Sequence, residues 1–410
     1  MRFTFLTTLY PSYIKAFYAA RPGLESRPYD EQKAALDFDG FAWNGALEPA
    51  LKPLGYVVHS VYANVAPLQR AWATEQGISW PATGWVEGIA WRQLQAFRPE
   101  ILWVDGLTVF RRRWIDRARE TCLGLRWVLG FAGVDLYDLE TVKACDAMFS
   151  CAWRPVEYFR RVGGKAFLFR HAFNPAILSR MPPAIAPLNE LLFAGSIARG
   201  EGSHLERERL IETLVAAVPM AIHCPQSEIS YRRDWIETNL RRSLYIIMQT
   251  LKQVGVDDAM LRRLPKVGQA ADWRAMPMRR INPGLHRRMK APIYGVEMFT
   301  AVRNHAVTLN THIDLARAEA GNSRLFEATG VGGCLLTDWK ANLKEMFELD
   351  REVAVYRSHE ECLEKARWLL NHPSERNALA RAGQVRVLRE HTFAHRAVEL
   401  DRLIHAELMS

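Results

Sequence analysis

The chain of 410 residues is 49% hydrophobic and 24% charged, which is typical of globular proteins and excludes a disordered chain. At this length we expect two domains rather than one. The net charge of +9 suits acidic small molecules, phosphates or an anionic membrane surface. No run of 18 apolar residues predicts a membrane span, and no Walker A, Gly-x-Gly-x-x-Gly or nucleic-acid-binding motif occurs.

The cysteines and the N-terminus indicate a cellular compartment. Six cysteines are scattered in mostly apolar contexts without a Cys-x2-Cys pair, as expected of buried thiols in a reducing cytosol. The apolar N-terminus stops at Pro11, which is too short for a signal segment and better suits a first strand. We therefore predict a cytoplasmic protein, with peripheral contact at the inner face of the membrane as a further option.

Short apolar runs alternate with helical segments through the N-terminal half. Strands are expected at 3–6, 56–61, 101–105, 126–130, 147–151 and 166–169, and helices at 14–20, 29–38 and 44–54. This alternation predicts an α/β domain with a parallel, doubly wound sheet.

Three side chains that follow these strands are candidates for acceptor chemistry. Asp135 follows a Gly-containing loop and could orient an acceptor hydroxyl or take its proton. The preferred alternative is that Asp135 is the N-cap of a helix at 136–144. His171 and Asp105 also leave strand ends, where a structural role is the more frequent one.

A Pro-rich segment at 181–187 is the best domain boundary in the chain. We predict an N-terminal domain at 1–183, a C-terminal domain at 184–385 and a terminal helix at 386–410. In the second domain, a strand at 191–194 runs into Gly195 and Ser196, with Arg199 close behind, before a helix at 204–215. Glycine permits close backbone approach, and a helix N-terminus behind it can hold a diphosphate.

The segment 227–283 departs from the strand–helix rhythm and is predicted to be a helical insertion. Apolar residues recur there at helical spacing, and basic residues lie nearby: Trp235, Leu240, Leu244, Ile247, Met248 and Leu251, with Arg232, Arg233, Arg241 and Arg242. One interpretation is an amphipathic helix that faces a membrane or a partner. The preferred interpretation is packing against the domain.

The most informative stretch is 307–338. A strand at 306–309 exits at Asn310, a helix begins at Arg324 after two good N-cap residues, Asn322 and Ser323, and a second strand covers 334–338. The helix N-terminus suits a phosphate, and Arg324 can add a bidentate contact to an anion. Glu327 lies one turn further in, where a carboxylate can accept hydrogen bonds from a ribose diol.

This stretch resembles the C-terminal domain of GT-B glycosyltransferases, in particular the family 1/4-like group that includes CgeB-like proteins. The residues that carry the resemblance are Asn322, Arg324, Phe326, Glu327, Gly332, Gly333, Leu335, Leu336, Thr337 and Asp338. Glu319 and Glu327 also fit the Glu-x7-Glu motif of many retaining members. The usual Gly-Phe-Gly between the two acids is replaced here by Gly-Asn-Ser at 321–323.

The resemblance implies a GT-B fold of two Rossmann-like domains that face each other across a cleft. The acceptor would bind the first domain and the nucleotide-sugar the second, with Gly195 and Ser196 facing the diphosphate and Tyr294 near the base. Glu327 would bind the ribose, and Glu319 would lie near the donor sugar. The terminal helix would cross back onto the first domain.

The implied activity is transfer of a hexose from a nucleotide-diphospho-sugar, such as a UDP- or GDP-sugar, to a hydroxyl of a glycan, a lipid-linked sugar or a protein. It would proceed with retention and without a metal, because Arg side chains and helix dipoles stabilise the leaving diphosphate. A role in bacterial surface glycan biosynthesis would follow. The alternatives are a non-catalytic relative that keeps the fold and a basic nucleic-acid-binding protein, although we expect no nucleic acid partner.

Overall fold

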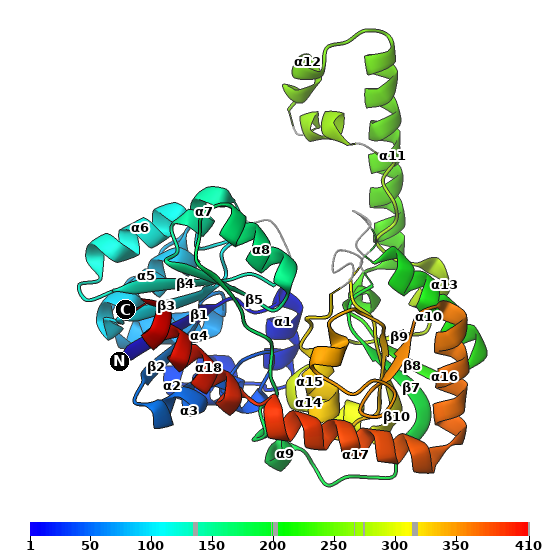
Figure 1. Cartoon of the computed structure of the whole chain (residues 1–410). Helices are drawn as coiled ribbons and strands as arrows, with labels where there is room; N and C mark the ends of the chain where they lie inside the picture. The colour runs from blue at the N-terminus through cyan, green and yellow to red at the C-terminus, as the bar shows by residue number, and fades with distance from the viewer. Residues whose placement is uncertain are drawn as a thin grey trace.

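The protein is described by a computed structural model for residues 1–133, 138–197, 199, 204–265, 267–273, 275–313 and 319–408. It consists of two lobes, each built around a six-stranded parallel sheet with helices on both faces, and of an arm that projects from the second lobe (Figure 1). The predicted doubly wound α/β architecture is confirmed. None of the helices in the described part of the chain is long and apolar enough to cross a membrane.

The first sheet has the strand order β2-β1-β3-β4-β5-β6. Its strands are β1 Arg2–Thr7, β2 Val57–Tyr62, β3 Ile101–Asp105, β4 Trp127–Phe131, β5 Ala147–Ser150 and β6 Ala166–Leu168. Their inner residues are buried on both faces, which explains why parallel strands appear in the sequence as continuous apolar runs. The helices are α1 Pro11–Ala19, α2 Tyr29–Asp39, α3 Leu47–Leu51, α4 Ala66–Glu75, α5 Trp85–Phe97, α6 Arg112–Thr121, α7 Leu139–Lys143, α8 Trp153–Arg161 and α9 Ile177–Arg180.

The helix expected at 136–144 requires a correction. Helix α7 begins only at Leu139, and Asp138 is its N-cap, because the Asp138 carboxylate accepts the backbone N–H of Glu140 at 3.1 Å. Asp135 itself lies outside the described residues, so neither of its two predicted roles is placed by the structure.

The second sheet has the strand order β12-β11-β10-β7-β8-β9. Its strands are β7 Leu188–Ala194, β8 Met220–His223, β9 Met289–Lys290, β10 His305–Asn310, β11 Leu335–Asp338 and β12 Ala354–Tyr356. The two-residue strand β9 was not predicted, because so short an edge strand leaves no periodic pattern. The helices around this sheet are α10 Leu205–Ala217, α13 Pro283–His286, α14 Gly295–Asn304, α15 Arg324–Gly330, α16 His359–Asn371 and α17 Pro373–Glu390.

The insertion forms the arm. Helix α11, Tyr231–Gln253, leads away from the second lobe, and α12, Asp258–Arg262, folds back against its far end (Figure 1). The tip has a small core of its own, in which Met248 and Leu261 are buried. The insertion is helical, as predicted, but the preferred interpretation that it packs against the domain is wrong.

The C-terminal segment crosses from the second lobe to the first. The helix expected from residue 386 is interrupted, since α17 runs to Glu390 and α18, Phe393–Leu403, begins after a break. At the break, Phe173 N–H donates to His391 O at 2.9 Å, and Phe393 N–H donates to Phe173 O at 3.0 Å. Helix α18 then buries Phe393 and Leu400 in the core of the first lobe, which ties the two lobes together.

Candidate active site

The loop that precedes α15 touches the first lobe. The Glu319 carboxylate accepts the backbone N–H of Arg154, in the first turn of α8, at 3.2 Å. Gly321 packs against Cys151 so closely that a Cβ atom would lie 3.1 Å from the Cys151 Sγ atom. The carboxyl ends of strands from both sheets therefore face each other, and ligands of parallel α/β sheets bind at such edges.

Arg324 and Glu327 form an ion pair at the start of α15. The Arg324 Nη1 and Glu327 Oε2 atoms are 3.2 Å apart, and both side chains are largely buried. Arg324 Nη2 also donates to the Ala194 carbonyl oxygen at 3.2 Å, at the end of β7, and its Nη1 contacts the Met298 sulfur. The guanidinium group thus joins the ends of two elements where the sequence predicts the diphosphate.

Two asparagines order the loop above this ion pair. Asn322 Nδ2 donates to Asn310 Oδ1 at 2.6 Å, and Asn310 Nδ2 donates to Thr337 Oγ1 at 3.0 Å. Ser323 occupies the N-cap position of α15, but its hydroxyl makes no capping hydrogen bond. Of the two N-cap candidates, Ser323 therefore holds the position without capping the helix through its hydroxyl, and Asn322 links the strand ends instead.

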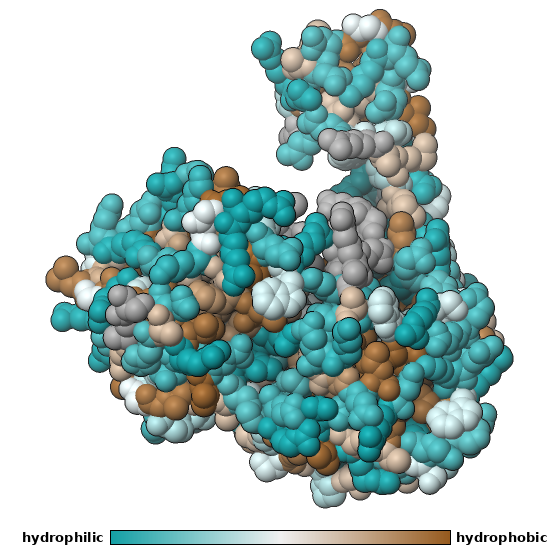
Figure 2. All heavy atoms as spheres, viewed as in Figure 1, coloured by the Kyte–Doolittle hydropathy of each residue, from teal (hydrophilic) through white to brown (hydrophobic). Residues whose placement is uncertain are grey.

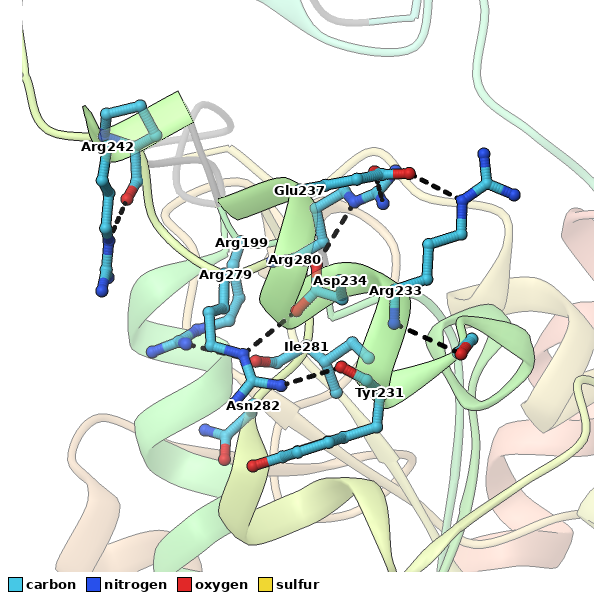
Figure 3. A network of polar contacts seen from close by, with 12 residues as sticks. Arg199, Tyr231, Arg233, Asp234, Glu237, Arg242, Arg279, Arg280, Ile281 and Asn282 are labelled. Atoms are coloured by element: carbon cyan, nitrogen blue, oxygen red, sulfur yellow. Dashed lines mark hydrogen bonds and ion pairs between the residues drawn. The ribbon is translucent and has the colours of Figure 1, made fainter. Parts of the chain in front are cut away.

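The turn after β7 makes its own contacts. Gly195 N–H donates to the His223 carbonyl at 3.0 Å, and the Ser196 hydroxyl accepts Gln226 Nε2–H at 3.1 Å. Arg199 is directed to the base of the arm, where its Nε is 2.8 Å from Glu208 Oε1 and its Nη1 donates to Ile281 O at 3.3 Å (Figure 3). Gly195 and Ser196 follow the strand that Arg324 contacts, whereas Arg199 is engaged elsewhere.

Tyr294 lies between the lobes. It is the N-cap of α14, and its hydroxyl donates to Ser12 Oγ of the first lobe at 2.8 Å. Its ring packs edge-on against Tyr13 and Phe41, with ring centroids 5.5 and 5.4 Å apart. Burial raises the pKa of Tyr294, so its hydroxyl stays protonated at neutral pH.

His171 belongs to an aromatic cluster of the first lobe. Trp43 Nε1–H donates to His171 Nδ1 at 3.0 Å, and the imidazole packs edge-on against Trp43 and Phe131. Burial, reinforced by the charge of Arg396, lowers its pKa to about 4, so the ring is neutral. Because Nδ1 accepts, the proton resides on Nε2. His171 is therefore placed to donate a hydrogen bond rather than to act as a base.

Asp105 is a titratable carboxyl group at this edge of the first sheet. It ends β3, and its Oδ2 accepts the Thr7 hydroxyl at 2.9 Å. Burial raises its pKa to about 7, and the hydrogen bond from Thr7 only partly offsets this. A carboxyl group with this pKa exchanges protons near neutrality, as a general base must.

Carboxylates from both lobes raise the pKa of the same neighbouring side chains, Cys151 and Tyr10. The Cys151 thiol has a pKa raised to about 12, chiefly by burial, and Asp105 and Glu319 both add to the shift. Tyr10 follows β1 and its ring is largely exposed, yet desolvation of the hydroxyl raises its pKa, with further contributions from Asp105 and Glu327. The charges of Asp105, Glu319 and Glu327 therefore reach side chains that follow strands of the first sheet, and Tyr10 is one of these side chains.

Two cavities lie away from this region. One, of about 570 Å³, is beside α4 and is lined by Arg27 and Arg70, and another, of about 620 Å³, is at the tip of the arm. Neither is lined by residues of the site. The part of the chain that the structure describes holds no group of three or more His, Cys, Asp or Glu side chains arranged for a metal ion.

Known proteins share this architecture. A family model described as glycosyl transferase-like matches residues 207–402, which span Glu319, Arg324 and Glu327. Sucrose-phosphate synthase from Thermosynechococcus elongatus is 13% identical, with a TM-score of 0.52 over 99% of this chain and 98% of that one. HepE from Anabaena, in complex with UDP and glucose, is 10% identical, with a TM-score of 0.52 over 99% and 100%. No curated protein matches the chain by sequence.

The chain has the GT-B fold, and its residues 207–402 match the glycosyl transferase-like family. The family match covers nearly half of the chain, and the likeness to the two solved structures shows the fold of the whole. The resemblance recognised in the sequence is thus confirmed at the level of GT-B glycosyltransferases. The CgeB-like subgroup is not singled out and stays a prediction.

The residues predicted from the sequence take different positions in the structure. Those gathered near the Arg324–Glu327 ion pair are Gly195, Ser196, Asn310, Asn322, Ser323, Arg324 and Glu327. Glu319 and Tyr294 instead contact the first lobe, and His171 lies within it. Tyr10 was not predicted as a site residue, because a single tyrosine before a proline matches no motif. The one signal in the sequence was its position directly after the first strand.

Proposed function

We propose that this protein transfers a sugar from a nucleotide-diphospho-sugar, such as a UDP- or GDP-sugar, to a hydroxyl acceptor. The observation that carries the proposal is the Arg324–Glu327 ion pair at the start of α15, behind a loop whose Glu319 contacts the backbone of Arg154 in the opposite lobe. The family match and the GT-B fold support the same chemistry. The solved HepE structures contain UDP and UDP-glucose, and we choose a nucleotide-sugar donor by analogy with them.

On the donor side, the diphosphate would take over the Arg324 guanidinium group. Glu327, released from its ion pair, would then accept the ribose hydroxyls. Asn310, Asn322, Ser323, Gly195 and Ser196 would shape the loops around the diphosphate, and Tyr294 would lie by the base. As the sugar leaves, negative charge grows on the diphosphate, and a pre-positioned guanidinium stabilises it without requiring a metal.

On the acceptor side, Asp105 would orient the hydroxyl and take its proton. With a pKa near 7, Asp105 is partly ionised at neutral pH, so it can accept a proton and release it again. Tyr10, whose hydroxyl remains protonated, would donate a hydrogen bond in the same space. Of the groups predicted from the sequence, Asp135 lies outside the described residues, and His171 would contribute only its Nε2–H.

We propose retention of the anomeric configuration, on the grounds of Glu319 and Glu327. Glu319 accepts a hydrogen bond from the first lobe, so it stands where donor and acceptor would meet. NMR of the product linkage tests this. An inverted product would remove the two glutamates from any stereochemical role and leave Asp105 as the base of a direct displacement.

The acceptor class stays open among glycans, lipid-linked sugars and proteins. We keep the cytoplasmic location and a role in bacterial surface glycan biosynthesis as proposals. The location is supported by six cysteines that are all free thiols. Peripheral contact with an anionic membrane rests on the net charge of +9 and is tested by co-sedimentation with anionic vesicles at low and high salt.

A non-catalytic relative is the second candidate, since the Arg324 guanidinium is already satisfied by Glu327 and the Ala194 carbonyl. Incubation with UDP- and GDP-sugars separates the two. Slow release of sugar from one donor, lost in Asp105→Asn when the acceptor is water, supports the enzyme. Nucleotide binding without any release of sugar supports the non-catalytic protein.

A further inference from the structure

The base of the arm is firmly anchored. Asp234, near the start of α11, is fully buried and accepts the Arg280 backbone N–H at 3.0 Å and the Arg279 Nε–H at 3.2 Å (Figure 3). The Arg279 guanidinium also stacks on the Tyr231 ring, 4.0 Å from its centroid. The Arg242 Nε–H, farther along α11, donates to the Pro277 carbonyl at 2.9 Å. These contacts hold α11 and the returning chain together as one rigid stem.

Several cationic side chains of the arm are engaged in ion pairs and hydrogen bonds. Besides the arginines that hold Asp234, Arg233 Nε lies 2.6 Å from Glu237 Oε1, and Arg280 also pairs with Glu237. The segment 243–251 carries no charged residue at all. Attraction to an anionic surface would need free cations beside the apolar residues. Between residues 243 and 251 there are none, and Arg241, next to Leu240, is one exposed cation in the first half of the helix.

One face of α11 carries an exposed apolar stripe. We define the α11 stripe as Ile236, Leu240, Ser243, Ile247 and Thr250 of the helix, together with Val254, its C-cap residue. Its four large apolar side chains are 42, 66, 54 and 72% exposed, in the order Ile236, Leu240, Ile247 and Val254, and Figure 2 shows hydrophobic side chains on the surface of the arm. The residues are spaced 4, 3, 4, 3 and 4 apart, which is the seam of a coiled coil. At 1.5 Å per residue the stripe is about 27 Å long.

We propose that the α11 stripe binds the α11 stripe of a second copy of this chain in antiparallel orientation. The spacing is the same read in either direction, so two copies match around a two-fold axis near residue 245. In that register Leu240 faces Thr250 of the second copy, and Ile247 faces its Ser243. Large side chains therefore meet small ones, as close packing requires. Ile236 and Val254 close the seam at each end.

The positions beside the seam agree with this partner. Asn239, Ile246 and Gln253 flank it on one side, and none of them is charged, so two copies meet on that side without like-charge repulsion. Ile246, which is itself exposed, would meet its own copy near the axis. A single seam of this length lies at the low end of specific interfaces, about 1,000 Å² in total. The dimer should therefore dissociate on dilution, and it does not depend on the proposed glycosyl transfer.

Sedimentation equilibrium of the full chain over a hundredfold concentration range tests the proposal. We expect a monomer–dimer equilibrium whose dissociation constant rises at least a hundredfold in Leu240→Glu/Ile247→Glu. Met260→Glu is the matched control, because Met260 is 67% exposed on the same arm but lies outside the stripe, and its dissociation constant should be unchanged. Unaltered circular dichroism and melting of the double variant would show that the fold is intact.

Cysteine cross-linking then tests the register. A mixture of Leu240→Cys and Thr250→Cys chains should give disulfide-linked pairs, and each variant alone should give far fewer. Efficient linking of Leu240→Cys to itself would overturn the antiparallel arrangement. The proposal as a whole is overturned by a monomer at all concentrations, by a dimer that persists in the double variant, or by a monomer whose stripe instead carries binding to anionic vesicles.

Discussion

Two aspartates, a half-buried one at the candidate active site and a fully buried one at the base of the arm, have opposite pKa shifts. Burial raises the pKa of Asp105 to about 7, because only the Thr7 hydroxyl opposes it. Burial acts on Asp234 in the same direction, but hydrogen bonds from Arg280 and Arg279 outweigh it and lower its pKa. The site thus keeps a carboxyl group poised to exchange a proton, whereas the arm uses one as a fixed anchor.

The same contrast applies to two arginines, and removing the one at the candidate site, Arg324, gives the largest effect. Arg324→Ala should lower kcat/KM by about 10²–10³-fold, because a group that stabilises the charge of the leaving diphosphate is lost. Donor-dependent product formation measures it. Arg199→Ala, at the base of the arm, should cost stability and leave kcat/KM within about threefold. An equal loss of kcat/KM in both variants would mean that Arg199 also contributes to the donor site, against this account.

Asp234→Ala should destabilise the protein by about 3 kcal/mol, because it leaves Arg279 and Arg280 without their buried partner. Urea denaturation followed by hydrogen exchange of α11 measures the loss and locates it. Asp116→Ala, which breaks a half-exposed ion pair with Arg112, is the control and should change stability by less than about 0.5 kcal/mol. Similar losses in both would mean that Asp234 does not anchor the arm.

Asp105→Asn should lower kcat/KM by about 10²-fold and remove its pH dependence. In the wild type, kcat/KM should rise with pH through about 7, because Asp105 must be ionised to take a proton. The stability of the folded protein should instead decrease as the pH rises. The folded-state pKa lies above the unfolded value of 3.8, so the folded state loses stability as the pH rises from about 4 to about 7.

The melting temperature of the same variant tests the predicted direction of this pH dependence of stability. Asp105→Asn should melt at a higher temperature than the wild type at pH 8, and the difference should vanish below pH 4. A wild-type rate that is flat between pH 6 and 8 would exclude Asp105 as the base.

Tyr10→Phe should give the smallest effect, a decrease in kcat/KM of about tenfold, because one hydrogen-bond donor is lost from the region shared by the two lobes. Steady-state kinetics measure it. Tyr18→Phe, whose hydroxyl bonds Gln32 away from the site, should leave the kinetics unchanged. Equal effects of the two variants would remove Tyr10 from the site.

The sheets could be predicted because strands buried on both faces must be apolar throughout. The ion pair on α15 could be anticipated, since Arg324 and Glu327 are three residues apart on one helix. The N-cap of α7 could not, because Asp135 and Asp138 both precede the helix and only the folded loop selects between them. That the charges of Asp105 and Glu319 both act on Cys151 was equally out of reach, since the two residues lie in different lobes.

For the arm, the sequence predicted the helix but not what its apolar faces contact. Helical periodicity in 227–283 correctly indicated a helix with apolar faces, but periodicity does not tell what covers them. Leu244 and Met248 pack into the tip of the arm, whereas Leu240 and Ile247, at equally regular spacing, remain exposed. An apolar side chain in the sequence looks the same whether its partner is its own chain or another molecule.

Binding of nucleoside diphosphates tests the central claim, that the Arg324–Glu327 region holds the donor, most directly. The melting temperature should be measured with UDP, GDP, ADP and dTDP for the wild type and Glu327→Ala. One nucleotide should raise the melting temperature of the wild type and leave that of Glu327→Ala unchanged. An equal rise in both proteins, or no rise with any nucleotide, would contradict the account.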